Sequence, residues 1–394
     1  MTSLSHGRSL VVGRAAAAGA TDAVVLVPGF MGFGRIGRFY YFSESITAAL
    51  RGALEARAGR PVVVVPSWTR ATDSLAVRQA FLLEQLQFLC GQLPALRRLH
   101  LVGHSTGGVD AQLLTCDRPL ADRSWTQDEQ GLRGRIASVV AIAAPHHGTF
   151  LARSMGARFL SHPVRYLRGF ATIARLIADV VPVVLHHPET DDLLSGITRQ
   201  APKALAFLRR VWQHRELIEE LDPAAMARLR ARVTPEKRVP LTSFVSAAAL
   251  DEHAPTPPDP LFCDLYGLVA EHTDANLPGL AAAIARLRAH PRLIAGETTL
   301  EPSMLGAETN DGMVSSGLQL LDAADPHELG GIVVGDHGDV IGHYDRKPAL
   351  FDKLPLNVGL FHSGSGFNDD AFFELYSQVA AAILRTIPDL PAPH

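Results

Sequence analysis

The chain has 394 residues, of which 47% are hydrophobic and 20% are charged, as in an ordinary globular protein. Its formal net charge of −3 leaves no basic surface for nucleic acid or for an anionic membrane. No stretch approaches the roughly 18 apolar residues that a membrane-spanning helix needs. This length suits one large enzyme domain with an insertion, or two smaller domains.

The N-terminal residues and the small number of cysteines bear on whether the protein is secreted or stays in the cytoplasm. Near the N-terminus, Ser, His, Gly and Arg interrupt the apolar stretches, unlike the pattern of a secretory signal peptide. The three cysteines, Cys90, Cys116 and Cys263, form neither a disulfide framework nor a closely spaced metal site. Cys90 and Cys116 are expected to be buried free thiols, and one disulfide is the alternative. We therefore expect a soluble, cytoplasmic protein.

Six short and nearly continuous apolar runs are typical of strands buried on both faces of a parallel sheet. Between the second and the third run, residues 74–93 carry apolar side chains at helical spacing. Strands that alternate with helices predict an α/β fold with a mostly parallel central sheet flanked by helices. The runs are Ala23–Val27, Val62–Val65, Leu99–Val102, Ile136–Ala143, Leu241–Ser246 and Gly331–Val334.

The middle of the chain differs from the rest. Residues 150–237 contain no clear strand and are rich in Arg, Ala and Leu, with helical patterns at Thr172–Val181 and Pro202–Leu221. We expect a helical lid or cap insertion at about 150–237 within a single domain of residues 1–394. Such an insertion would cover a site at the carboxyl edge of the sheet, and ordinary crossover helices are the alternative.

A serine follows the third run in the segment GHSTGG, and a helical pattern comes next. This is the G-x-S-x-G nucleophile elbow in its strand–turn–helix setting. The tight, strained turn needs glycine at Gly103 and Gly107, two residues before and after Ser105. The motif predicts Ser105 as the nucleophile of an α/β-hydrolase, and a serine in an ordinary turn is the alternative.

Such a nucleophile needs backbone N–H donors for the oxyanion that develops on the substrate. In this fold one donor belongs to the residue after the nucleophile, here Thr106. The second is expected from the turn after the first run, where Gly29 lets the backbone present the N–H of Phe30 to the site. The alternative is a tight turn with no catalytic role.

The acid and the base are expected late in the chain, in the order serine, acid, histidine. His337 follows the last apolar run in the segment GDHGD, and His343 is its competitor. The acid, which would hold the imidazole tautomer and stabilise the imidazolium, is Asp311 in a polar turn or Asp251 just past the fifth run. The topology alone leaves both acids open.

Taken together, these segments resemble the bacterial triacylglycerol lipase family, the group of the Pseudomonas and Burkholderia lipases. The resemblance spans residues 23 to 345 in separate segments, and it departs from the family at Pro28, where those lipases usually have histidine. It implies an α/β-hydrolase fold with a triad of Ser105, Asp311 and His337, and it favours Asp311 over Asp251. The segments are VPGFMGFGRIGRFYYF, AVRQAFLLEQL, GHSTGG, AAPHHGT, TNDGMV and DHGD.

The resemblance also bears on metal binding. It implies a structural calcium ion near the catalytic histidine, with Asp339 at a ligand position and Glu297 or Glu301 where the family has a second acidic ligand. The alternative is that Asp339 anchors its loop. His146 and His147 would lie beside the site, where packing or a hydrogen bond to the elbow is expected rather than metal ligation. No cofactor is expected to be required.

These observations predict a carboxylic ester hydrolase, a lipase or carboxylesterase, that cleaves a small-molecule ester or a lipid through an acyl-enzyme. An acyltransferase or a polyester depolymerase would use the same triad. A non-catalytic relative is a third alternative, although its usual mark, the loss of a triad residue, is missing. Because the family is exported and this chain shows no signal, its substrates would be esters other than bulk triglyceride.

Overall fold

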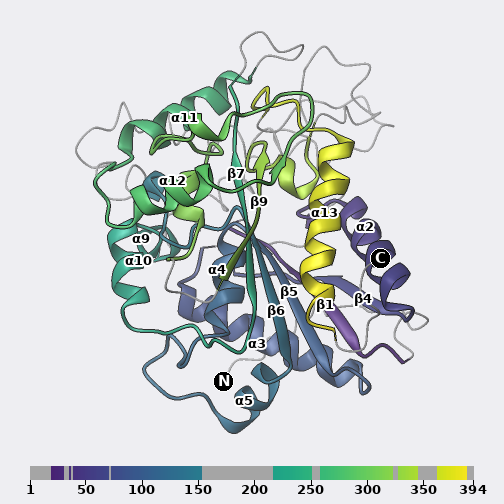
Figure 1. Cartoon of the computed structure of the whole chain (residues 1–394). Coiled ribbons are helices and arrows are strands. Elements are labelled where there is room, and N and C mark those ends of the chain that lie inside the picture. The colour runs from purple at the N-terminus through teal and green to yellow at the C-terminus, as the bar shows by residue number, and fades with distance from the viewer. Residues whose placement is uncertain are drawn as a thin grey trace, which may run out of the picture.

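The computed structural model describes residues 19–30, 35–36, 39–70, 72–152, 216–250, 258–322, 327–344 and 362–387. Within these residues, seven parallel strands form one sheet in the order β4-β1-β5-β6-β7-β9-β8 (Figure 1). A short antiparallel pair, β2 (Arg35–Ile36) and β3 (Phe39–Tyr40), lies outside the sheet. The sheet strands are β1 (Asp22–Val27), β4 (Val62–Pro66), β5 (Arg98–His104), β6 (Ile136–Ile142), β7 (Leu241–Ala247), β8 (Leu293–Ile294) and β9 (His327–Val334).

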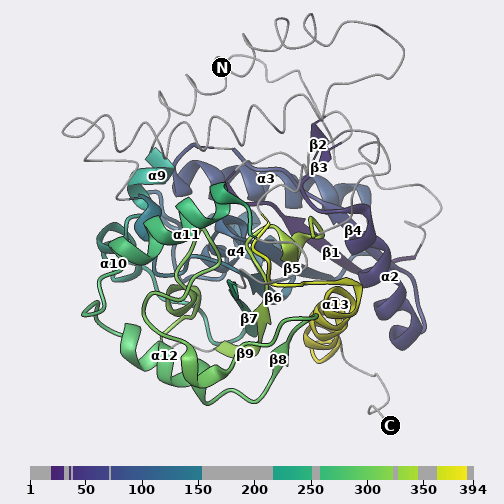
Figure 2. The same cartoon turned by 90° about the horizontal axis from the view of Figure 1, so that it is seen from above.

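Helices cover both faces of the sheet, and two clusters of buried side chains form the core. On one face, α2 and α13 lie side by side (Figure 1), with α2 packed on β4 and α13 packed on β6, β8 and β9. On the other face, α3 and α4 pack with α5 on the opposite side chains of β1, β4, β5 and β6, and Figure 2 shows α3 and α4 from above. These helices are α2 (Glu44–Ala58), α3 (Leu75–Gln92), α4 (Thr106–Leu113), α5 (Gln127–Arg133) and α13 (Asp369–Leu384).

A further group of helices packs at the side of the sheet where the chain runs from β6 to β9 (Figure 2). None of the described helices is long and apolar enough to cross a membrane. The group consists of α9 (Glu216–Glu220), α10 (Pro223–Arg230), α11 (Pro260–His272) and α12 (Leu280–Arg288), with the 3-10 turns η1 (Pro302–Met304), η2 (Ser316–Gln319) and η3 (Asp339–Ile341).

The structure confirms the predicted α/β-hydrolase fold class. Each of the six apolar runs overlaps a strand of the parallel sheet, and the helical pattern at 74–93 corresponds to α3. The sequence analysis missed β8, because a strand of two residues at the sheet edge carries no recognisable pattern. Residues 153–215 of the predicted insertion lie outside the described residues, and α9 and α10 are helical within the rest of it. The single domain and the lid remain predictions.

The cysteines are free in the described structure, as expected. Cys116 is buried, Cys90 is half-buried and Cys263 is exposed. Cys116 lies in a cluster with Val109 and Leu113 of α4, where it behaves as a small apolar side chain.

A buried polar cluster joins the amino ends of β1, β5 and β6. His100 contacts the Ser138 Oγ at 2.9 Å through Nδ1 and the Asp22 Oδ1 at 3.4 Å through Nε2, while Arg98 donates two hydrogen bonds to Asp22. Burial lowers the pKa of His100 below its ordinary 6.5. Burial would raise the pKa of Asp22, but hydrogen bonds from His100 and Arg98 outweigh it, so this pKa is lowered. The cluster therefore pairs a neutral imidazole with an ionised carboxylate.

His100 gives the fold a dependence on pH that His100→Gln should reduce. The folded protein keeps His100 neutral, whereas the unfolded chain binds a proton below about pH 6.5, so the free energy of unfolding falls as the pH drops through that value. We expect the unmodified protein to lose stability between about pH 7 and pH 5 more steeply than His100→Gln, by up to about 1.4 kcal/mol per pH unit. Urea unfolding across this range measures both slopes, and equal slopes would contradict the prediction.

Candidate active site

Ser105 lies in a sharp turn between the end of β5 and the start of α4, at the carboxyl edge of the sheet. Its backbone has φ 55° and ψ −135°, values that a residue with a side chain rarely adopts. The Ser105 N–H donates to the carbonyl of Ile142 at 2.9 Å, which ties the turn to the end of β6. Thr106 follows directly as the first residue of α4. This geometry is the nucleophile elbow predicted from the sequence.

The elbow has no room for side chains at its glycines. A Cβ on Gly103 would lie 2.3 Å from the carbonyl oxygen of Gly107, and one on Gly107 would lie 2.1 Å from that of Val27. Gly29 also has no room for a side chain, because a Cβ added there would lie 2.7 Å from the Cβ of Ser105. The turn after β1, which carries Gly29 and Phe30, therefore contacts the elbow directly.

The predicted acid and base are paired. His337 lies in the loop after β9, and its Nδ1 is 2.8 Å from the Asp311 Oδ2. The backbone N–H of His337 also donates to the Asp311 carbonyl at 3.0 Å, so the two loops are joined twice. Asp311 is fully buried, whereas His337 keeps 8% of its surface exposed. An imidazole held this way has Nε2 left to exchange a proton with a neighbouring group.

The ring of His104 brings this pair to the elbow. His104 immediately precedes Ser105, and its ring centroid lies 4.6 Å from that of His337. The His104 Nδ1 is 2.8 Å from the Tyr41 Oη, and burial lowers the pKa of His104 well below its ordinary value. His104 is thus neutral and packs between the elbow and the base. The structure therefore gathers Ser105, His337 and Asp311 at one edge of the sheet.

The alternative base is His343 and the alternative acid is Asp251. The His343 Nε2 is 3.0 Å from the carbonyl oxygen of Tyr41. Asp251 lies outside the described residues. Of the other histidines, His146 is buried and neither of its ring nitrogens bonds to a described residue, which fits packing. The geometry thus pairs His337 with Asp311.

Asp339 makes contacts that anchor its own loop. Its Oδ2 accepts the backbone N–H of Asp336 at 2.9 Å, and the Asp336 Oδ1 accepts those of Gly338 and Asp339. In the described part of the chain, which includes Glu297 and Glu301, no three His, Cys, Asp or Glu side chains gather as potential metal ligands. These contacts are those of a loop anchor. Calcium binding remains a prediction from the resemblance.

A buried ion pair that the sequence analysis missed supports the turn after β1, which carries Gly29 and Phe30. Arg78 of α3 and Asp110 of α4 are both fully buried, and the Arg78 Nε lies 3.1 and 3.2 Å from the two carboxylate oxygens. The Arg78 Nη2 also reaches the carbonyl oxygens of Pro28 and Gly29, each at 3.4 Å. Burial raises the pKa of Asp110, and Arg78 opposes that shift. The sequence did carry one sign of this pair, because Arg78 is a charged residue on the apolar face of the helix predicted at 74–93.

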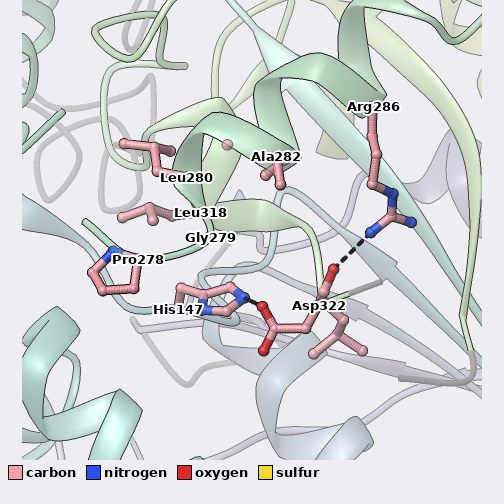
Figure 3. Close-up of a pocket in the computed structure, with 11 residues that line it drawn as sticks. His147, Pro278, Gly279, Leu280, Ala282, Arg286, Leu318 and Asp322 are labelled. Atoms are coloured by element: carbon pink, nitrogen blue, oxygen red, sulfur yellow. Dashed lines mark hydrogen bonds and ion pairs between the residues drawn. The ribbon is translucent and has the colours of Figure 1, made fainter. Parts of the chain in front are cut away.

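A small pocket with a cavity volume of about 50 Å³ lies between α12, η2 and the segment after β6 (Figure 3). Its wall is apolar at Leu280 and Leu318, and His147 and Asp322 approach each other across it at 3.5 Å beside Arg286. None of the predicted catalytic residues lines it. This pocket therefore lies apart from the predicted catalytic residues.

Comparisons with known proteins find a partial match to a lipase. No family model matches the chain. Over 137 residues it is 34% identical to the triacylglycerol lipase of Pseudomonas fragi, a match that covers 35% of this chain and 39% of that protein. The chain thus spans only about two fifths of this relative's length. In the matched part it resembles the lipases of the α/β-hydrolase superfamily.

Solved lipases and esterases resemble the structure distantly. EstA from Clostridium botulinum aligns with 94% of this chain and 88% of its own, at 16% identity and a TM-score of 0.49. The lipase of Staphylococcus hyicus aligns with 95% of this chain and 98% of its own, at 14% identity and a TM-score of 0.47. Because these scores are low, the fold assignment rests on the strand order and on the elbow after β5.

The close packing of the elbow gives a test by Gly107→Ala. The added methyl group would overlap the Val27 carbonyl, so we expect a loss of about 1–3 kcal/mol in the free energy of unfolding. Gly52→Ala is the matched control, because Gly52 lies within α2 with open space around it and should gain about 0.5–1 kcal/mol. Urea unfolding measures both variants. Equal stability of the two would show that the turn has room for a side chain.

The buried ion pair gives a second test. Arg78→Met leaves the Asp110 carboxylate buried without its cation, which should cost about 3–5 kcal/mol of stability. The double variant Arg78→Met with Asp110→Leu removes both charges and should recover much of that loss. Thermal or urea unfolding of the single and double variants measures the difference. A double variant that is less stable than Arg78→Met would argue against the pair being the cause.

Proposed function

We propose that this protein is a carboxylic ester hydrolase, a lipase or carboxylesterase, with Ser105 as nucleophile, His337 as base and Asp311 as acid. One observation carries the proposal: a strained serine on a strand–turn–helix elbow shares a sheet edge with a histidine bonded to a buried carboxylate at 2.8 Å. Serine hydrolases need this combination, because the hydroxyl is a poor nucleophile until a base removes its proton.

In the proposed reaction, the Ser105 Oγ attacks the ester carbonyl while the His337 Nε2 takes the hydroxyl proton. The tetrahedral oxyanion accepts hydrogen bonds from the backbone N–H groups of Thr106 and Phe30. The imidazolium then gives its proton to the leaving alkoxide, so an alcohol departs and an acyl-enzyme remains. A water molecule repeats the sequence on the acyl-enzyme, releases the acid and restores Ser105.

Asp311 is proposed to act on the imidazole alone. Its Oδ2 accepts the Nδ1 proton of His337, which fixes the tautomer that leaves Nε2 free to accept. The ionised carboxylate also stabilises the positive charge that His337 gains in each step. Asp311 therefore stays deprotonated while His337 is charged and discharged.

The finer assignment extends the same proposal. The sequence segments and the match to the Pseudomonas fragi protein support a relative of the bacterial triacylglycerol lipases that acts on a small-molecule ester or a lipid. A cytoplasmic location, and catalysis without a required cofactor, belong to the same proposal and rest on the sequence patterns. Product analysis with added alcohol acceptors separates hydrolysis from acyl transfer.

Replacement of the nucleophile provides the decisive test. We expect Ser105→Ala to lower the kcat for p-nitrophenyl esters by about 10⁴-fold or more, because no other group supplies the attacking oxygen. His337→Gln should lose activity to a similar extent, whereas His343→Gln, the matched control, should keep it. The assay covers esters of increasing acyl length, and unchanged thermal unfolding verifies the fold of each variant.

A chemical probe gives an independent check on Ser105. A fluorophosphonate should modify Ser105 in the unmodified protein, as located by mass spectrometry of the digested chain, and should leave Ser105→Ala unlabelled. Full esterase activity in Ser105→Ala, or labelling at another serine with Ser105 untouched, would overturn the assignment.

A further inference from the structure

The Asp311 carboxylate receives more hydrogen bonds than a triad requires. Among the described contacts, its Oδ1 accepts the backbone N–H groups of Met313 at 3.0 Å and Val314 at 2.8 Å. Its Oδ2, the oxygen that faces His337, also accepts the Ser246 hydroxyl at 2.5 Å and the Gln319 Nε2 at 3.2 Å. The turn of Asp311 itself therefore holds Oδ1, whereas side chains from elsewhere hold Oδ2.

Ser246 reaches the acid from the sheet. It is the second-last residue of β7, is completely buried, and pairs with Val333 of β9. Because β9 leads directly into the loop of His337, one strand pair positions both the hydroxyl and the base. A hydroxyl group on a rigid central strand is a well-fixed donor, since neither its backbone nor its neighbours can shift freely.

Gln319 reaches the same oxygen from η2. The pairing of β6 with β7 ends at Phe244, so Ser246 lies two residues beyond it with its backbone groups open on that side. The Gln319 carboxamide bonds to these backbone groups in place of β6: its Oε1 accepts the Ser246 N–H at 2.8 Å, and its Nε2 donates to the Ser246 carbonyl at 3.1 Å. These two contacts fix which end of the amide is the donor. The same Nε2 lies 3.2 Å from the Asp311 Oδ2 and 3.3 Å from the Val314 carbonyl oxygen, so the donor end of the amide faces the acid.

We propose that Ser246 and Gln319 are positioning residues that hold the Asp311 Oδ2 in line with the Nδ1 of His337. This inference rests on the proposed function, since it assigns a role to groups that touch the triad acid and not the substrate. Together with the Met313 and Val314 amides, they fix both carboxylate oxygens, so the carboxylate cannot rotate about its Cβ–Cγ bond. The imidazole then keeps one orientation and one tautomer through the reaction.

Kinetics of Ser246→Ala and Gln319→Met test the role. Both variants remove a donor to Oδ2 and leave the substrate contacts intact, so we expect kcat to fall about tenfold or more while KM stays within about twofold. Ser246→Thr keeps the hydroxyl and should retain kcat. Ser243→Ala is the matched control, because Ser243 is buried on the same strand and its Oγ bonds to no described group. It should match the unmodified protein.

A spectroscopic readout makes the test independent of turnover. The Nδ1 proton of His337 should give a resolved downfield proton NMR signal, identified by its loss in His337→Gln. We expect this signal to persist in Ser243→Ala and to broaden by exchange with water in Ser246→Ala and Gln319→Met, because their acceptor oxygen is no longer fixed. Ser246 lies in β7 and Gln319 lies in η2. If one variant fails to fold, the other still tests the role.

The outcomes separate the two proposals. Retained kcat together with an unchanged downfield signal in both Ser246→Ala and Gln319→Met would overturn the positioning role, whatever the substrate. An unmodified protein that hydrolyses no ester would instead overturn the proposed function, while the NMR signal would still decide how Asp311 is held. Loss of the signal in Ser243→Ala as well would assign the effect to general loosening of β7 and would also count against the role.

Discussion

The left-handed backbone of Ser105 is the constraint on which the rest of the site depends. Strain of this kind persists only where the surroundings leave the chain no alternative. Here the constraint comes from close backbone contacts, since Gly103 and Gly107 pack without room for a Cβ and the end of β1 presses on the serine itself. The parallel sheet makes this part of the chain rigid, because its central strands are buried on both faces and paired on both edges.

The same sheet edge explains why the acid and the base come from distant parts of the chain. Strands β5, β7 and β9 lie near one another in the sheet and all end at this edge, so the loops that follow them converge. Ser105, Ser246 and His337 stand at or just after those three ends. Only Asp311 comes from a turn outside the sheet, and it is also the group with the most supporting hydrogen bonds.

Sequence alone could predict the features that local patterns encode. Continuous apolar runs marked six strands because those strands are buried on both faces, and the glycines around Ser105 marked the elbow because only glycine fits there. The residues that support the site escaped prediction for the opposite reason. Arg78 meets Asp110 across 32 positions and Ser246 meets Asp311 across 65, and a single sequence carries no sign of such pairings. The choice of Asp311 over Asp251 likewise needed the family resemblance, because both acids suit the topology.

The guanidinium of Arg78 has an effect on the peptide unit that joins Gly29 to Phe30. A trans peptide is planar, so its carbonyl and its N–H point in opposite directions. Arg78 binds the carbonyl end of this unit from behind the loop, and the N–H of Phe30 is therefore turned toward the other side. The positive charge also draws electron density toward the carbonyl oxygen, which makes the N–H a stronger donor. A fully buried cation thus both orients and polarises the N–H group that is proposed to donate to the oxyanion.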